Sequence, residues 1–133
     1  MKIIAHAVES LADAKRALAW GCDLLEFDIS QNILTGNFVI QHDALKGKIG
    51  IGKNPMNLLC SKFKEKLLID LKAAKYSLNY PRKFNKFIKS QKIKDLKLTS
   101  IDLKVASLIA KQNNAQIYYG FLNTKSIDYF WKI

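Results

Sequence analysis

Apolar residues along the chain follow two spacings, a period of two typical of strands and a period near 3.6 typical of helices. Ser10 is placed as a helix N-cap, with Asp13 as its capping-box partner and Gly21 ending the helix, so the first segment predicts a parallel βαβ unit. The predicted strands are Ile3–Ala7, Asp23–Ser30, Phe38–Asp43, Leu67–Lys72, Asp95–Asp102 and Gln116–Phe121; the later helices are Met56–Lys66, Pro81–Gln91 and Leu103–Asn113; and Ile127–Ile133 is either a short strand or a terminal helix.

Two carboxylates interrupt the strongest strand pattern, Asp23–Ser30, which reads DLLEFDIS. Side chains alternate across a strand, so Glu26 and Asp28 point to the same side, about 7 Å apart. Both neighbours of Glu26 are apolar, which predicts a strand buried on both faces. Like charges facing an interior are costly unless a cation lies between them. The pattern predicts a divalent metal with oxygen ligands, Mg²⁺ or Ca²⁺ first; the alternative is a solvated face carrying ordinary surface charge.

Length and composition predict one domain, residues 1–133, with the residue usage of an ordinary globular protein. No apolar run is long enough to form a transmembrane segment, and the N-terminus lacks the pattern of a signal peptide. Cys22 and Cys60 have neither metal-binding nor redox spacing and give no disulfide framework. A reducing, cytoplasmic location fits this cysteine usage best.

The net charge of +11 is unevenly distributed. Residues 1–60 hold six basic and six acidic residues, so the whole surplus lies in residues 61–133. A basic half could bind nucleic acid, anionic lipid or a phosphorylated substrate, or lysine could simply be the default surface residue of this chain. A nucleic-acid-binding module over Lys62–Lys111 is disfavoured, because aromatic residues are not interleaved with the lysines and no recognition motif appears.

The segment Ala44–Pro55 contains three glycines and predicts a loop. Gly47, Gly52 and Lys53 match the spacing of a phosphate-binding GxxxxGK loop. Asn54 stands where that loop needs Ser or Thr, and no buried strand leads directly into it. We therefore favour a flexible lid over a phosphate-binding loop.

Four predicted strands carry polar side chains near their C-terminal ends, which is where the active sites of β/α barrels lie. These side chains are His6, Glu26 with Asp28, His42 with Asp43, and Asp70 with Lys72. Three carboxylates would bind a divalent cation, two imidazoles would form a general acid and base pair, and an ammonium would neutralise charge on a phosphate. The set predicts metal-assisted cleavage of a phosphodiester. Taken singly, each residue also fits a structural role, such as a hydrogen-bonded histidine, a cap at Asp43 or an Asp70–Lys72 ion pair.

The segments IIAH, GCDLLEFDIS, FVIQHD and LLIDLK, in this order between residues 3 and 72, resemble the glycerophosphodiester phosphodiesterase family. That family has a strand ending HRG, a strand with ExD, a following HD and a later strand close to EIK, and weaker similarity continues to about Phe121. The resemblance implies hydrolysis of glycerophosphodiesters to glycerol phosphate and an alcohol, with Mg²⁺ or Ca²⁺ as the metal. By position, the catalytic residues would be His6, His42 and Lys72, and the metal ligands Glu26, Asp28 and Asp70.

Three features depart from the family's pattern. Ala7 replaces the Arg that follows the first histidine, and Asp70 replaces a Glu, which shortens that ligand by one methylene. A β/α barrel needs about 250 residues, so the expected fold is an α/β, TIM-type (β/α) barrel that is incomplete, with about five to six of eight βα units. The closing part would come from a homo-oligomer, from a complementing chain, or from coverage by Ser126–Ile133. The alternative function is that of a catalytically inactive partial barrel, acting as a subunit or interaction protein.

Overall fold

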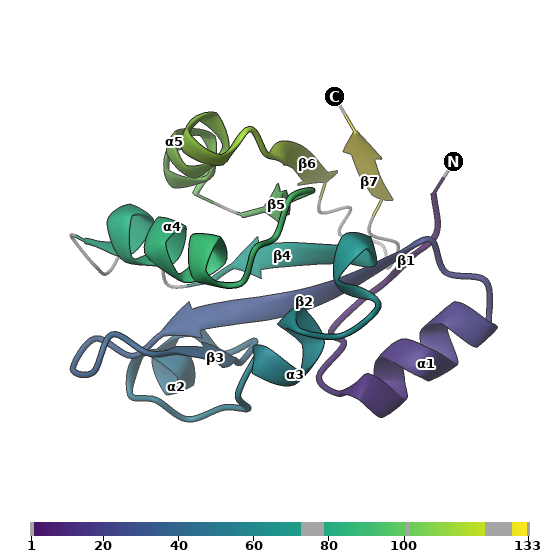
Figure 1. Ribbon diagram of the computed structural model, residues 1–133, viewed down its shortest axis with the longest axis horizontal. Helices are drawn as coiled ribbons and strands as arrows, with labels where there is room; N and C mark the ends of the chain where they lie inside the picture. Colours follow the sequence, from purple (N-terminus) through teal and green to yellow (C-terminus); the bar gives the residue numbers. More distant parts are fainter. Residues whose placement is uncertain (1, 73–78, 101, 122–128, 133) are drawn as a thin grey trace.

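The computed structural model describes residues 2–72, 79–100, 102–121 and 129–132 (Figure 1). Strands and helices alternate through most of the described chain, as the sequence pattern predicts. The elements are β1 (Ile4–Ala5), α1 (Leu11–Ala19), β2 (Leu24–Gln31), β3 (Phe38–Ile40), α2 (Ala44–Lys48), α3 (Met56–Leu59), the 3-10 turn η1 (Lys64–Lys66), β4 (Leu67–Leu71), α4 (Tyr80–Ser90), β5 (Lys97–Thr99), α5 (Leu103–Asn113), β6 (Gln116–Phe121) and β7 (Tyr129–Lys132).

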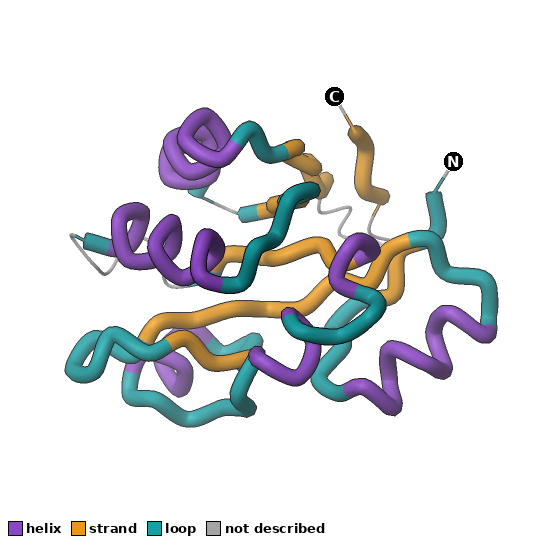
Figure 2. Tube along the Cα trace, in the orientation of Figure 1, coloured by secondary structure: helices purple, strands orange, loops and turns teal. Residues whose placement is uncertain are grey.

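The strands form one sheet in the order β1-β2-β4-β5-β6-β7, with β3 also paired to β2 (Figure 2). Neighbours from β1 to β6 along this order are parallel, whereas β3 is antiparallel to β2 and β7 is antiparallel to β6. The βαβ unit made by β1, α1 and β2 confirms the prediction for the N-terminal segment.

The expectation of an incomplete TIM-type (β/α) barrel, with about five to six of eight βα units, is wrong, because the strands form an open, curled sheet instead. Among the described strands, β1 and β7 each pair with a single neighbour, so the two edges of the sheet do not meet. The antiparallel β7 ends the parallel series after β6. Closing a barrel requires a full circle of tilted, staggered strands, and this array is too short to make one.

Helix α1 has the capping contacts that the sequence predicts. The Ser10 hydroxyl accepts a hydrogen bond from the Asp13 amide and donates one to the Asp13 carboxylate at 2.6 Å. Gly21 follows α1 with a φ of 87°, in the left-handed region that favours glycine. Asp102 caps α5 by accepting from the Val105 amide. Among the described residues, no helix has the length and apolar character needed to cross a bilayer.

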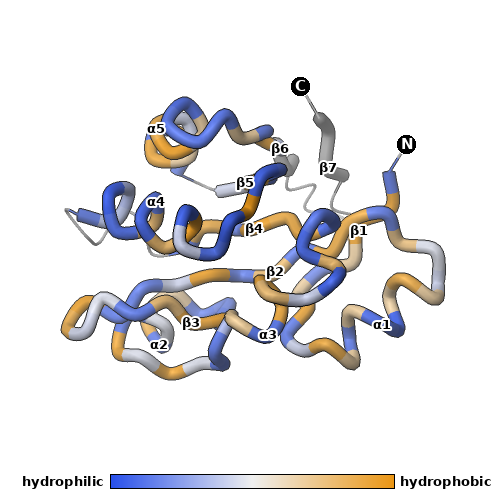
Figure 3. Tube along the Cα trace, viewed as in Figure 1, coloured by the Kyte–Doolittle hydropathy of each residue, from blue (hydrophilic) through white to orange (hydrophobic). Residues whose placement is uncertain are grey.

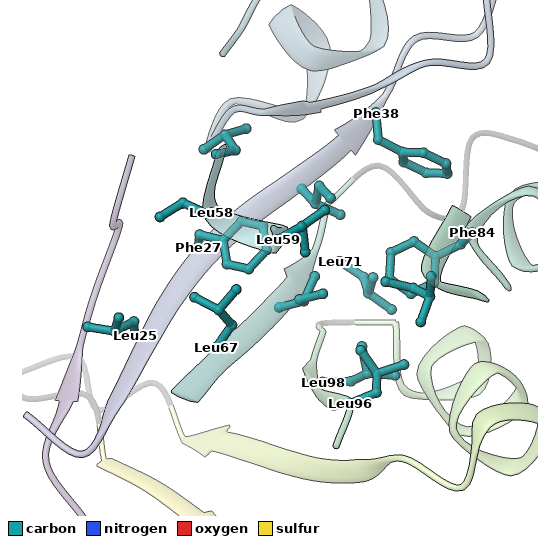
Figure 4. Close-up of a cluster of buried hydrophobic side chains, with 14 of the residues drawn as sticks. Leu25, Phe27, Phe38, Leu58, Leu59, Leu67, Leu71, Phe84, Leu96 and Leu98 are labelled. Atoms are coloured by element: carbon teal, nitrogen blue, oxygen red, sulfur yellow. The ribbon is translucent and has the colours of Figure 1, made fainter. Parts of the chain in front are cut away.

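The main core lies between one face of the sheet and helices α1, α3, α4 and α5. Figure 4 shows part of it, including Phe27 of β2, Leu59 of α3 and Phe84 of α4. Phe27 on β2, Ile69 on β4 and Leu98 on β5 are all fully buried in this layer. Phe38 on β3 meets the α4 ring Phe84 edge to face, with ring centroids 5.6 Å apart. The opposite face of the sheet has only a small apolar cluster, which consists of Leu24, Leu68 and Tyr118 with Ile4 against it. The polar side chains of β2 and β4 therefore share a separate face from the main core.

The predicted glycine-rich loop is in part the helix α2, and it is packed tightly against the end of β2. A Cβ on Gly47 would lie 2.1 Å from the Ser30 Cβ, and one on Gly52 would lie 2.6 Å from the Ile40 carbonyl oxygen. The Lys53 ammonium pairs with the Glu9 carboxylate at 2.7 Å. These glycines serve close packing of the backbone, which argues against both the phosphate-binding loop and the flexible lid.

We expect Gly47→Ala to lower the free energy of unfolding by about 2 kcal/mol, because the added methyl overlaps the Ser30 side chain. Urea denaturation would measure the change. The control is Ser30→Gly, alone and combined with Gly47→Ala, since removing the Ser30 Cβ gives the new methyl room. If the losses in free energy of unfolding of the two single variants simply added in the double variant, the proposed contact between the methyl group added by Gly47→Ala and the Ser30 side chain would be contradicted.

Candidate metal centre

Three carboxylates converge on the face of the sheet opposite the main core. Parallel pairing of β2 and β4 sets Asp28 directly beside Asp70, and Glu26 lies two residues earlier on the same face. One oxygen from each of the three lies within 4.8 Å of the others. Glu26 is fully buried and Asp28 is only 4% exposed. The structure thus brings together the three residues that the sequence predicts as metal ligands, and such a group could hold a divalent ion.

Lys72 lies between two of these carboxylates. Its Nζ is 3.1 Å from an Asp28 oxygen and 2.6 Å from an Asp70 oxygen. The position is set by the backbone, because the Lys72 amide continues the β4–β2 ladder by donating to the Ile29 carbonyl at 2.8 Å. The ammonium offsets much of the repulsion between Asp28 and Asp70.

Glu26 is held by the loop that follows β1. The His6 Nδ1 lies 2.8 Å from Glu26 Oε2, and the Ala7 amide donates to the same oxygen at 2.9 Å. The second oxygen, Oε1, is buried and has no hydrogen-bond partner within the described part of the chain. A buried carboxylate oxygen without a donor is costly. This unpartnered atom, in a cluster of three carboxylates, fits a site that receives a cation.

Ala7 adopts a backbone conformation that serves this contact. Its φ of 53° lies in the left-handed region, which costs a non-glycine residue about 1–2 kcal/mol. The same residue donates its amide to Glu26. Backbone strain of this kind persists where surrounding interactions impose it, and it is concentrated at functional sites.

Burial and neighbouring charges shift the pKa values of the cluster in different directions. For Asp28, burial and then the charge of Glu26 raise the pKa to about 6, against the opposing effect of Lys72. Burial likewise raises the pKa of Asp70. Burial also disfavours ionised Glu26, but its hydrogen bonds from His6 and Ala7 outweigh this effect and lower its pKa. Clustered groups with divergent pKa values are typical of functional sites.

For Lys72, burial favours the neutral amine, but the hydrogen bond and charge of Asp70 dominate and raise its pKa. Lys72 therefore stays protonated between the two carboxylates.

The structure places His42 differently from the sequence prediction. The strand β3 ends at Ile40 and runs antiparallel to β2, so His42 does not follow a parallel strand. The Gln41 amide donates to the Asp28 carbonyl at 3.1 Å, which brings the chain next to the carboxylates one residue before His42. The His42 side chain is exposed, and among the described residues its ring makes no hydrogen bond to the other predicted site residues.

Asp43 accepts hydrogen bonds from the Leu45 and Lys46 amides. This contact favours the structural alternative for Asp43, a cap, over a role in the predicted site.

Two groups near the centre were not identified from the sequence. The Ala7 amide acts through the backbone, which residue patterns do not report. Thr99 on β5 is buried and pairs in register with Asp70. The available signal is the position of Thr99, a polar residue at the C-terminal end of the strand KLT, where the carboxylates of the neighbouring parallel strands also lie.

A scan against protein-family models and a search of curated proteins both find no match to this chain. The resemblance to glycerophosphodiester phosphodiesterases therefore stays a prediction.

We expect Lys72→Met to lower the free energy of unfolding by about 3 kcal/mol, because it leaves Asp28 and Asp70 side by side without a cation. Millimolar Mg²⁺ or Ca²⁺ should restore part of this loss, since an ion that binds only the folded state stabilises it. Thermal and urea denaturation with and without metal would measure both effects. The control is Lys53→Met, which removes an exposed ion pair and should change stability little, with no response to metal. Unchanged stability of Lys72→Met would refute the proposed charge balance.

Proposed function

We propose that this protein is a metal-dependent phosphodiesterase that hydrolyses glycerophosphodiesters to glycerol phosphate and an alcohol. The observation that carries the proposal is the buried Glu26 oxygen without a hydrogen-bond partner, within a cluster of three carboxylate oxygens that lie within 4.8 Å of one another. The order of the four resembling segments supports the same reaction.

Glu26, Asp28 and Asp70 would hold Mg²⁺ or Ca²⁺, both of which prefer oxygen ligands. The ion would act as a Lewis acid toward the phosphate group. Lys72 would contribute its positive charge to binding the phosphate from the rim of the cluster, where its side chain is 17% exposed.

His6 is arranged to move a proton. Its Nδ1 lies 2.8 Å from the buried Glu26 carboxylate, which orients the imidazole and favours a proton on that nitrogen, so Nε2 would be the atom that exchanges a proton with the substrate. The side chain is 47% exposed, so a substrate can reach it from solvent. His42 would be the second acid–base group, contributed by the turn between β3 and α2.

One observation favours a non-catalytic protein instead. Lys72 pairs with both Asp28 and Asp70, and Glu26 Oε2 has two donors, so most of the buried charge is balanced within the chain. A centre of this kind could be purely structural in a subunit or interaction protein. Direct metal titration of the wild-type protein separates the two functions.

The setting of the proposed reaction is the cytoplasm. Cys22 and Cys60 are both free thiols, which fits a reducing compartment.

We expect turnover of bis(p-nitrophenyl) phosphate and of glycerophosphocholine to require Mg²⁺ or Ca²⁺. Glu26→Gln should remove metal binding and turnover together, because it removes a ligand charge. His42→Ala should keep metal binding but lower kcat by about 10²–10⁴-fold, the usual contribution of a general acid or base. The control is Glu9→Gln, an exposed carboxylate outside the cluster. Folded wild-type protein that binds no divalent metal and shows no turnover would overturn the proposal in favour of the structural alternative.

Metal affinity should rise with pH. The pKa of Asp28 is raised to about 6, so below this pH a proton occupies a ligand that the ion needs. Affinity should fall about tenfold for each pH unit below that value and change little above it. Calorimetric titration in buffers of different ionisation enthalpy would count the released protons, with about one per ion expected on the acidic side. Affinity that does not fall below pH 6 would contradict the raised pKa of Asp28 or its role as a ligand.

A further inference from the structure

Exposed large apolar side chains are concentrated at one end of the molecule. The described residues include ten such side chains, and five of them lie in the β2–β3 turn and around α2. Both segments contain orange, hydrophobic stretches in Figure 3. We call these five the apolar tip; its members are Ile33, Leu34, Leu45, Ile49 and Ile51. Leu34 is 88% exposed, Leu45 68% and Ile49 66%. Single exposed apolar residues are ordinary, but a cluster indicates a surface that binds something.

Backbone contacts join the members of the tip into one surface. The Ile33 amide donates to the Lys48 carbonyl at 3.0 Å, which ties the β2–β3 turn to the end of α2. Leu45 and Ile49 are four residues apart on one helical turn, where side chains share a face. The tip is therefore a fixed feature of the fold.

The surroundings of the tip are basic. Residues 29–64 contain a single acidic residue, Asp43, whose carboxylate already accepts two backbone amides of α2. A groove beside the tip separates the turn Thr35–Asn37 from α4, and Lys83 and Lys86 line it. The Lys83 ammonium lies 3.0 Å from the position that a Cβ on Gly36 would occupy. Residues 79–94 contain no acidic residue.

We propose that the apolar tip and the lysines beside it form a docking surface for an anionic phospholipid membrane. Exposed leucine and isoleucine side chains flanked by lysines fit the interface of a bilayer, where apolar groups enter the acyl boundary and ammonium groups meet lipid phosphates. Charge complementarity favours this partner over a second copy of the chain, because two such tips facing each other would place lysines against lysines.

The docking surface lies beside the candidate metal centre. Gly47 of α2 packs on Ser30, which shares the face of β2 that carries Asp28. Leu45 of α2 is three residues after His42, which lies in the turn that leads into this helix. A docked membrane would thus bring lipid head groups close to the centre, although the docking itself does not depend on the proposed catalysis.

The test is co-sedimentation of the full chain with vesicles of phosphatidylcholine containing phosphatidylserine, and with vesicles of phosphatidylcholine alone. We expect binding to the anionic vesicles that weakens as salt rises. The triple variant Leu34→Ser, Leu45→Ser, Ile49→Ser should lose at least about tenfold in affinity. The double variant Lys83→Glu, Lys86→Glu should lose about 25-fold or more, since each lysine near an anionic surface contributes about fivefold.

Matched controls distinguish binding through this surface from nonspecific hydrophobic or electrostatic binding to vesicles. Trp20→Ser removes an apolar side chain that is 81% exposed directly after α1, and Lys104→Glu with Lys111→Glu reverses two exposed charges on α5. Both controls should bind vesicles like the wild type. Equal losses in test and control variants, or equal binding to both vesicle types, would overturn the proposal.

Two further measurements complete the test, and neither depends on catalysis. The emission of Leu34→Trp should shift to the blue on anionic vesicles, whereas that of Leu108→Trp on α5 should not. Sedimentation velocity tests whether the tip instead binds a second copy of the chain. If the wild type is a dimer that does not bind vesicles, and the triple variant is a monomer, the tip would be assigned to self-association.

Discussion

Three carboxylates buried side by side on β2 and β4 impose the main constraint on this structure. Parallel register sets Asp28 against Asp70, and strand alternation adds Glu26 to the same face. Their mutual repulsion must be offset locally, because burial removes Glu26 and Asp28 from the screening that water would provide. Lys72 from the end of β4 and His6 from the end of β1 both serve this purpose. The C-terminal ends of β1, β2 and β4 therefore lie together for two reasons, the packing of their apolar residues and the balance of charge among the groups that they carry.

This arrangement explains how a centre can form on a sheet that does not close. All three carboxylates come from two adjacent strands, and the groups that hold them come from residues directly after β1 and β4. The β5 strand adds Thr99 beside Asp70, while β6 and β7 lie further along the sheet. The open, curled sheet consequently keeps the complete cluster without the strands that a closed barrel would add.

The segment between β3 and β4 links the centre to the molecular surface. Its glycines allow the backbone to approach Ser30 and Ile40, so α2 is seated against the end of β2. The same segment carries His42 in the exposed turn before α2, and it carries three members of the apolar tip, Leu45, Ile49 and Ile51. Tight packing on one side and exposed apolar residues on the other are consistent with a rigid platform that presents a binding surface.

The sequence by itself determined the local elements and the face shared by Glu26 and Asp28. Helix α5 and strand β6 have the bounds that periodicity predicts, and Ser10 caps α1 as its position indicates. These features depend on near neighbours in the chain, whose spacing the sequence records directly.

Only the tertiary structure decided how the strands pair and which groups the ends of long side chains, such as that of Lys72, contact. It made β3 antiparallel, moved His42 to an exposed turn, placed Lys72 between two aspartates and left the sheet open. Each of these outcomes depends on contacts between residues distant in the chain. Short apolar strands carry little information about the direction or identity of their partners, and that is why the sequence pattern could not predict them.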